Sequence, residues 1–146
     1  MGDSVTTRVK WVEGHRFVAT TGSGFSLVLD NPHREDGAAA SPMELLLVSL
    51  AGCTGVDVVA ILEKMRQPLD RFEVVAEGFR APEHPRVYTE VDVVYRAWGD
   101  GLKPAKLRRA VELSEGKFCS VSAMLKPTVR INVRIELNGE PLPDEI

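Results

Sequence analysis

The sequence predicts a single α+β domain in which antiparallel strands surround a central helix. The run from Ser41 to Gln67, about 25 residues long, has apolar side chains on every side of a helical wheel. Stretches of alternating apolar and polar residues precede and follow this run. The 146 residues, of which 44% are hydrophobic and 27% charged, are enough for one packed core. We therefore expect residues 1–146 to form one domain.

Three short strands are expected before the helix. Residues 5–13 alternate between apolar and polar side chains, and residues 16–20 and 25–30 have the composition of two further strands. The Gly-Ser-Gly sequence at residues 22–24 supplies a turn between the second and third strands. Residues 31–40 are polar and predict a loop that leads into the helix.

The central helix has a start signal and a stop signal. Ser41 is placed as the N-cap, Pro42 as the first helical residue, and Glu44 follows Ser41 by three residues, which is a capping box. Pro68 marks the end, because the residue before a proline is disfavoured in helical conformation. A helix without a polar face needs cover on every side, and one chain has too few strands to supply it. We therefore expect an obligate homodimer in which two such helices bury each other.

A membrane span is the alternative explanation for this apolar helix. Asp57 would lie at its centre, where a carboxylate costs roughly 2.5–3.5 kcal/mol to insert. The usual basic and aromatic flanks are absent, so we expect no membrane association. The net charge of −3 gives no reason to expect nucleic acid as a partner. Residues 1–10 lack the apolar stretch of a signal peptide, and a cytoplasmic location is expected.

Two longer strands are expected after the helix. Residues 71–80 place Phe72 and Val74 on the inward face, and residues 87–98 alternate regularly between apolar and charged side chains. The intervening residues 81–86 contain two prolines and predict a turn.

The remainder of the chain predicts two helices and a final strand. A helix with one apolar stripe begins near Pro104 and should break at Gly116. A short helical segment follows Cys119, and residues 128–137 form the last strand. Asn138 and Gly139 close the fold before a loose tail. The predicted order is βββ-α-ββ-α-α-β.

The two cysteines are the candidate reactive groups. A thiol acts as a nucleophile only as the thiolate, which positive charge or a helix N-terminus favours. Cys119 would lie at such an N-terminus, whereas Cys53 lies in mid-helix and would need an arginine from elsewhere. Either cysteine could instead be a small buried residue. Gly52 and Gly55 flank Cys53, and close approach of a ligand or tight helix packing would explain them equally well.

The three histidines are scattered along the chain without the spacing of metal ligands, so we expect no metal site. The two cysteines lie 66 positions apart and do not suggest a disulfide framework. Any disulfide in a cytosolic protein would be transient and catalytic.

The chain resembles the OsmC-like superfamily in two stretches, SPMELLLVSLAGCTGVDVVAIL and EGKFCSVSAMLKP. This superfamily includes the osmotically inducible protein C and the organic hydroperoxide resistance proteins. The resemblance extends from KWVEG to the last strand, and the Ser-Pro-Met-Glu helix start marks a subgroup. It implies the OsmC-like fold, an intertwined homodimer with antiparallel sheets wrapped around two long central helices.

The resemblance also implies a thiol peroxidase mechanism. The Cys53 thiolate would attack the O–O bond of an organic hydroperoxide and become a sulfenic acid. Cys119 would then form a disulfide with Cys53, and a lipoyl-type dithiol would reduce that disulfide. No metal, flavin or haem cofactor is implied.

Two residues depart from the pattern of the family's peroxidases. A glutamate that holds an activating arginine follows the helix-opening proline in those proteins, and Met43 stands at that position here. Glu44, one residue later, is the candidate for this catalytic glutamate. The shift rotates its side chain by about 100° around the helix, and its capping role is a sufficient structural explanation for it. Arg16 is the nearest candidate for the arginine and Arg8 the next.

Three functions remain open from the sequence. The first is a cytosolic, dithiol-dependent organic hydroperoxide reductase. The second is a non-enzymatic module of the same dimeric fold that binds an apolar ligand or senses oxidation at the dimer interface. The third is a purely structural role for both thiols. The distance between the two sulfur atoms and the charges around Cys53 discriminate among them.

Overall fold

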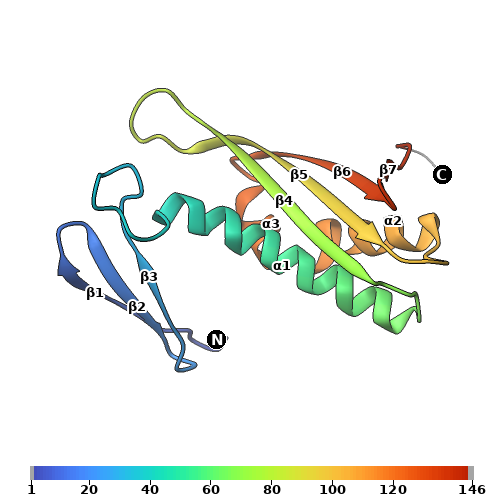
Figure 1. Cartoon of the computed structure of the whole chain (residues 1–146), viewed down its shortest axis with the longest axis horizontal. Helices are drawn as coiled ribbons and strands as arrows, with labels where there is room; N and C mark the ends of the chain where they lie inside the picture. The colour runs from blue at the N-terminus through green and yellow to red at the C-terminus, as the bar shows by residue number, and fades with distance from the viewer. Residues whose placement is uncertain (1, 145–146) are drawn as a thin grey trace. The chain divides into compact units, whose positions relative to one another are not determined.

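The computed structural model describes residues 2–144, and Figure 1 shows an α+β fold with two sheets and three α-helices. The contacts of the chain divide it into two compact units, one that ends at Leu46 and one that begins at Leu47. The elements follow in this order: β1 (Thr7–Glu13), β2 (Arg16–Thr21), β3 (Ser26–Leu29), α1 (Pro42–Lys64), β4 (Arg71–Arg80), β5 (Tyr88–Trp98), α2 (Pro104–Leu113), a π-helical turn (Ser114–Phe118), α3 (Ser120–Leu125), β6 (Arg130–Leu137) and β7 (Glu140–Pro141).

The first unit contains an antiparallel sheet in the order β1-β2-β3. It confirms the three strands predicted before the helix, although β1 begins at Thr7 rather than at residue 5. Every residue of β1 is exposed in the single chain, including Val9 at 52% and Trp11 at 63%. This strand therefore buries no apolar face within its own chain.

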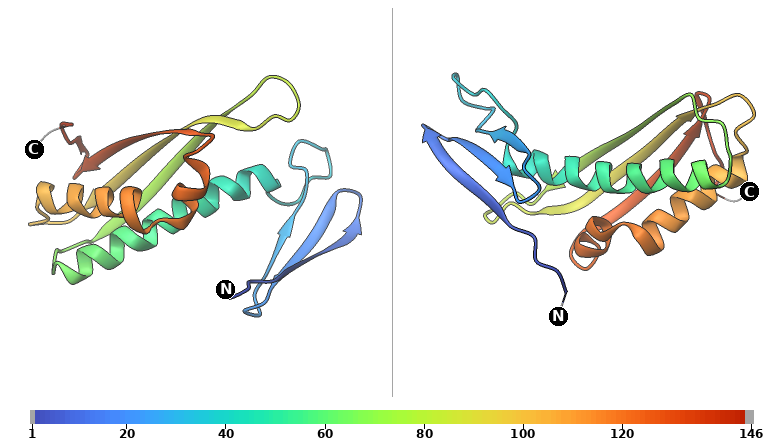
Figure 2. Two further views of the ribbon diagram at one scale, coloured as in Figure 1. Left: turned by 180° about the vertical axis from the view of Figure 1, so that it is seen from behind. Right: turned by 90° about the horizontal axis from the view of Figure 1, so that it is seen from below.

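The second unit contains a sheet in the order β4-β5-β6-β7, and its helices lie on one face of that sheet (Figures 1 and 2). The predicted alternation of β5 is confirmed, because Val91, Val93, Tyr95 and Ala97 are buried at 0–1% exposure. On β4, a Cβ atom at Gly78 would lie 2.5 Å from the ring of Tyr88, so this position has no room for a larger residue.

Two details of the second sheet differ from the prediction. The β5–β6 pair is parallel rather than antiparallel, because α2, the π-helical turn and α3 carry the chain back to the end where β5 began. The chain after Gly139 is not a loose tail, because Glu140 and Pro141 pair with β6 as strand β7. The turn at Asn138 and Gly139, both with positive φ, makes this hairpin possible.

The predicted start of α1 is confirmed in atomic detail. The Ser41 N–H donates to Glu44 Oε1 at 2.9 Å, and the Glu44 N–H donates to Ser41 Oγ at 3.1 Å. These reciprocal bonds are the expected capping box. The helix ends at Lys64, four residues before Pro68.

The prediction that α1 is buried on every side is not met within one chain. Its buried residues form one stripe at every fourth position, which comprises Leu50, Thr54, Val58 and Leu62. Among the other positions, Val48, Val56 and Val59 are 62%, 71% and 42% exposed. By length and composition alone, α1 is also long and apolar enough to cross a membrane, and 22% of its most apolar window is buried. One chain thus covers a single stripe of this helix.

The segment between α2 and α3 also differs from the prediction. Gly116 does not break the second helix, because the backbone continues from Leu113 through a π-helical turn that ends at Phe118. The Cys119 N–H donates to the Ser114 carbonyl at 2.9 Å and closes this turn. Cys119 follows this turn with an extended backbone and is the N-cap of α3, as the sequence suggested. Single π turns of this kind occur frequently at functional sites.

Candidate functional site: a dithiol and a carboxylate

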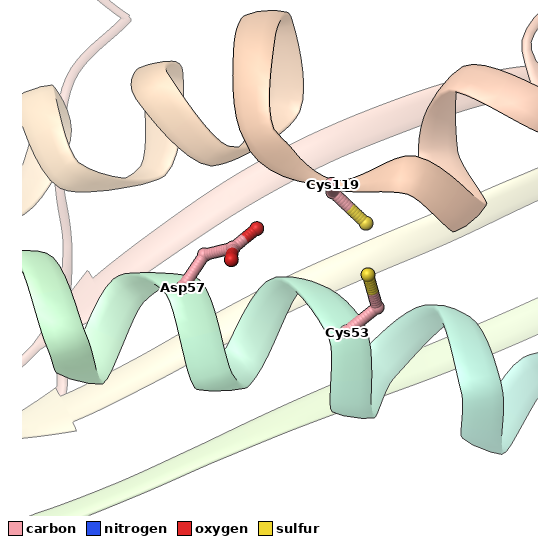
Figure 3. Close-up of side chains that lie close together, drawn as sticks. All are labelled: Cys53, Asp57 and Cys119. Carbon is pink, nitrogen blue, oxygen red and sulfur yellow. The ribbon is translucent and has the colours of Figure 1, made fainter. Parts of the chain in front are cut away.

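The structure brings Cys53 and Cys119 together with a carboxylate that the sequence analysis did not include in the site. The two Sγ atoms and one carboxylate oxygen of Asp57 all lie within 4.8 Å of one another. Figure 3 shows the two thiols pointing toward each other from α1 and from the start of α3, with Asp57 beside them. Both cysteines are free thiols.

The position of each group follows from its local structure. Cys53 and Asp57 are four residues apart on α1, so their side chains lie on one face, next to the buried stripe of Thr54 and Val58. Cys119 follows the π-helical turn directly, and its Sγ accepts a hydrogen bond from the Ser122 N–H at 3.3 Å. Cys119 is 3% exposed, whereas Cys53 and Asp57 are half-buried. The site therefore has one enclosed thiol and one that solvent can reach.

A buried hydroxyl network holds Asp57 in place. Ser114 Oγ donates to Asp57 Oδ2 at 2.9 Å and lies 2.7 Å from Thr54 Oγ1. Thr54 Oγ1 in turn lies 2.6 Å from the hydroxyl of Tyr95. All three hydroxyl residues are 0% exposed. Buried polar groups are stable only when paired, so this network fixes the carboxylate relative to the sheet.

Glu115 completes the network on the side of Cys119. Its carboxylate accepts hydrogen bonds from the hydroxyls of Tyr95 and Ser122, and the Lys126 ammonium lies 3.9 Å from its Oε2. Burial, followed by the charge of Glu115, raises the pKa of Tyr95 well above its usual range. Tyr95 is thus held as a neutral hydroxyl donor.

The electrostatics of Cys119 contradict what its helix position suggested. The pKa of this thiol is raised to about 11, chiefly by burial and in smaller part by the neighbouring Cys53 and Glu115. The hydrogen bond from the Ser122 N–H acts in the opposite direction but is outweighed. Desolvation and negative charge here exceed the effect of a six-residue helix N-terminus. Cys119 is consequently a neutral thiol at physiological pH.

The two other predicted site residues belong to the first unit, where each has local partners. The Arg16 guanidinium donates to Asp30 Oδ2 at 3.0 Å, to Glu13 Oε1 at 3.2 Å and to the Asp36 carbonyl at 3.0 Å. Hydrogen bonds from backbone N–H groups, led by that of Asn31, lower the pKa of Asp30, and Arg16 contributes in the same direction. These contacts tie the end of β3 to the loop that follows it.

Glu44 is the second of these residues, and the Ser41 N–H is the largest cause that lowers the pKa of its carboxyl. The capping box therefore accounts for Glu44 locally. The catalytic roles expected of Arg16 and Glu44 stay predictions.

The glycines beside Cys53 line a groove between α1 and β4. This groove has a volume of about 740 Å³ and is mainly apolar, with Val56 and Val59 from α1 and Val74 from β4 among its lining residues. A Cβ atom at Gly52 would meet nothing within 4 Å, and one at Gly55 would make only ordinary contacts. Close packing within this chain therefore does not explain the two glycines. Their place in the groove leaves both earlier explanations open, a bound ligand or a partner helix.

Sequence reasoning missed Asp57 and Ser114 as parts of the site. Asp57 did carry a signal, because a lone carboxylate four residues after Cys53 in an apolar helix must share its face. Ser114 carried none, because its orientation depends on the π-helical turn.

Comparison with known proteins gives one consistent result. The OsmC-like protein family matches residues 35–134. The Escherichia coli K12 protein YhfA is 40% identical over 130 residues, which cover 89% of this chain and 96% of YhfA. A crystal structure of a hypothetical protein from Aquifex aeolicus is 34% identical with a TM-score of 0.83, over 94% of this chain and 98% of that one.

The organic hydroperoxide resistance protein OhrB of Bacillus subtilis shares the fold at 16% identity, with a TM-score of 0.62 over 93% of this chain and 98% of that one. At this identity the likeness extends to the fold alone. The family match and the identity to YhfA together show that this chain belongs to the OsmC-like protein family.

Proposed function

We propose that this chain is a thiol-dependent peroxidase that reduces organic hydroperoxides with Cys53 and Cys119. The observation that supports this function most directly is the proximity of two free thiols that are 66 residues apart in the sequence. A disulfide needs the two sulfur atoms to approach to about 2.05 Å. The two sulfur atoms are separated by at most 4.8 Å, so they need to approach by less than about 3 Å.

Cys53 is the thiol that attacks the peroxide. It is half-buried and therefore reachable, whereas Cys119 is 3% exposed and its pKa is raised to about 11. The Cys53 thiolate attacks the distal oxygen of the hydroperoxide, the O–O bond breaks, and the leaving alkoxide takes up a proton to become an alcohol. Cys53 is left as a sulfenic acid.

Cys119 resolves this intermediate. Its sulfur attacks the Cys53 sulfenic acid, a disulfide forms, and the hydroxyl of the sulfenic acid leaves as water with the Cys119 proton. A lipoyl-type dithiol then reduces the disulfide by two exchange steps and is itself oxidised. The cycle needs no metal or organic cofactor. It also needs a reducing compartment, which supports a cytoplasmic location.

Activation of Cys53 is the step in which this chain departs from the family's peroxidases. The Asp57 carboxylate lies within 4.8 Å of both sulfur atoms, and Glu115 acts on Cys119 from its other side. Arg16, the proposed activating cation, is paired with Glu13 and Asp30 in the first unit. We therefore expect slow turnover, because a neighbouring carboxylate does not favour the thiolate that attacks the peroxide.

The active form is proposed to be a homodimer. The exposed valines of α1, Val48, Val56 and Val59, line an apolar groove that one chain leaves uncovered, and such a groove is typical of an interaction surface. A second copy of α1 is the occupant that matches this face in length and apolar character. The same groove supports the alternative function, a non-enzymatic module that binds an apolar ligand or senses oxidation at this interface.

Turnover of an organic hydroperoxide with excess dithiothreitol tests the proposal. Wild-type protein should consume cumene hydroperoxide, and Cys53→Ser should abolish this activity. Cys119→Ser should form the sulfenic acid but cycle more slowly, because the resolving thiol is absent. Asp100→Asn, at an exposed turn after β5, is a control that should keep full activity. Equal peroxide consumption by wild type and Cys53→Ser would refute the mechanism and leave the apolar-ligand module.

A further inference from the structure

The groups around Cys53 also have the composition of a metal site. Two sulfur donors and one carboxylate oxygen, from Cys53, Cys119 and Asp57, lie mutually within 4.8 Å. Two Zn–S bonds of about 2.3 Å at a tetrahedral angle place the sulfur atoms roughly 3.8 Å apart. The ligand atoms therefore need to close in by about 1 Å or less to surround one ion. We propose that the reduced chain binds one soft divalent cation, Zn²⁺ or its analogue Cd²⁺, through these three residues.

The type of donor sets the type of metal. Thiolates select soft or borderline cations, and two of them together with one carboxylate suit Zn²⁺ better than Mg²⁺ or Ca²⁺, which prefer oxygen ligands. Three protein ligands leave the fourth tetrahedral position for water, as in open zinc sites. The half-buried Cys53 and Asp57 provide the side from which an ion and this water enter.

The surroundings hold the carboxylate as a metal ligand requires. Ser114 Oγ donates to Asp57 Oδ2 at 2.9 Å and is itself fixed by Thr54 and the buried hydroxyl of Tyr95. Hydrogen bonds of this kind to a ligating group orient it and strengthen metal binding. Glu115, hydrogen-bonded to Ser122 beside Cys119, adds a second negative charge on that side. The thiols release their protons to solvent when the ion binds, so that two thiolates and the Asp57 carboxylate neutralise its charge.

The sequence predicted no metal site because the three histidines are scattered, and that prediction did not consider sulfur and carboxylate ligands together. The donors of the proposed site come from one helical turn and from a distant residue that the fold brings to it. The inference does not rest on the proposed peroxidase function, because it uses only the reduced thiols. It does imply that metal binding and a Cys53–Cys119 disulfide exclude each other, since both use the same two sulfur atoms.

Titration of the full chain with Cd²⁺ and Zn²⁺ tests this site, with a phosphine reductant in place of a thiol. We expect one ion per chain and a sulfur-to-cadmium charge-transfer absorption that reports thiolate ligands. Cys53→Ser and Cys119→Ser should each weaken binding at least about 10-fold and reduce this absorption, and Asp57→Asn should weaken binding by about 10- to 100-fold. Asp100→Asn removes the same charge from an exposed turn and should bind like wild type.

Three results would overturn the proposal. The first is wild-type protein that takes up no stoichiometric Cd²⁺ or Zn²⁺. The second is uptake that persists unchanged in Cys53→Ser, which would place the ion elsewhere. The third is unchanged affinity in Asp57→Asn, which would remove the carboxylate from the site. Circular dichroism identifies a variant that fails to fold, and the remaining variants then decide the outcome. Because no peroxide is present, the titration can fail or succeed independently of the peroxidase assay.

Discussion

The buried, neutral state of Cys119 leads to a quantitative prediction about its reactivity. A thiol with a pKa of about 11 is present as thiolate in a fraction of about 0.001 at pH 8, whereas a free cysteine with a pKa of about 8.5 reaches roughly 0.24. This difference slows alkylation about 240-fold. A thiolate of higher pKa is the better nucleophile, and a Brønsted coefficient of 0.4–0.5 recovers a factor of about 10 to 18. Cys119 should therefore react at least about 13-fold more slowly than free cysteine, and its burial slows it further.

The measurement is alkylation of the Cys53→Ser variant with iodoacetamide, in which Cys119 is the one remaining thiol. This variant loses the contribution of Cys53 to the raised pKa and keeps burial, which is the largest cause. Intact-mass spectrometry at pH 7 to 10 gives the rate, with free cysteine under the same conditions as the reference. The rate should rise about tenfold per pH unit over this whole range, because the thiolate fraction does so below the pKa. A rate that levels off below pH 9, or that equals the rate of free cysteine at pH 8, would refute the reasoning.

Three further predictions concern the network, the sheet and the exposed helix face. Thr54→Val removes a hydroxyl close to both Ser114 and Tyr95, so unfolding in urea should show a loss of about 1–3 kcal/mol, and no loss would contradict the role given to the network. Gly78→Ala places a Cβ atom 2.5 Å from the Tyr88 ring and should cost about 1–3 kcal/mol in the same assay, whereas unchanged stability would show that the ring yields. Val56→Glu puts a charge on the exposed face of α1, and light scattering should detect a shift from dimer to monomer, unless α1 lies outside the interface.

Much of the local structure could be predicted because its causes are local. The start of α1 depends on Ser41 and Glu44, three residues apart, and the structure shows both predicted hydrogen bonds. The alternation in β5 likewise predicted that Val91, Val93, Tyr95 and Ala97 are buried, because side chains of a strand point to opposite faces in turn, although Val94 on the other face is also buried. These signals need no knowledge of the rest of the chain.

The features that could not be predicted depend on contacts between distant segments. The parallel pairing of β5 with β6 depends on the path of the connecting helices, and strand alternation is the same for both directions. Gly116 usually ends a helix, but here a π-helical turn accommodates it and sets the direction of Cys119. The pKa of that thiol depends on burial against α1 and on Glu115, which the expected helix N-terminus did not reveal.

Formation of the Cys53–Cys119 disulfide after attack on the peroxide is the step on which the proposed function depends. Reduced wild-type protein, free of metal and added thiol, is treated with one equivalent of cumene hydroperoxide and digested for mass spectrometry. The peroxidase mechanism predicts a Cys53–Cys119 disulfide and one equivalent of cumyl alcohol, with no disulfide in either single-cysteine variant. Unchanged thiols and intact hydroperoxide, in protein whose circular dichroism shows it to be folded, would contradict the mechanism and leave a fold that holds two close thiols without this chemistry.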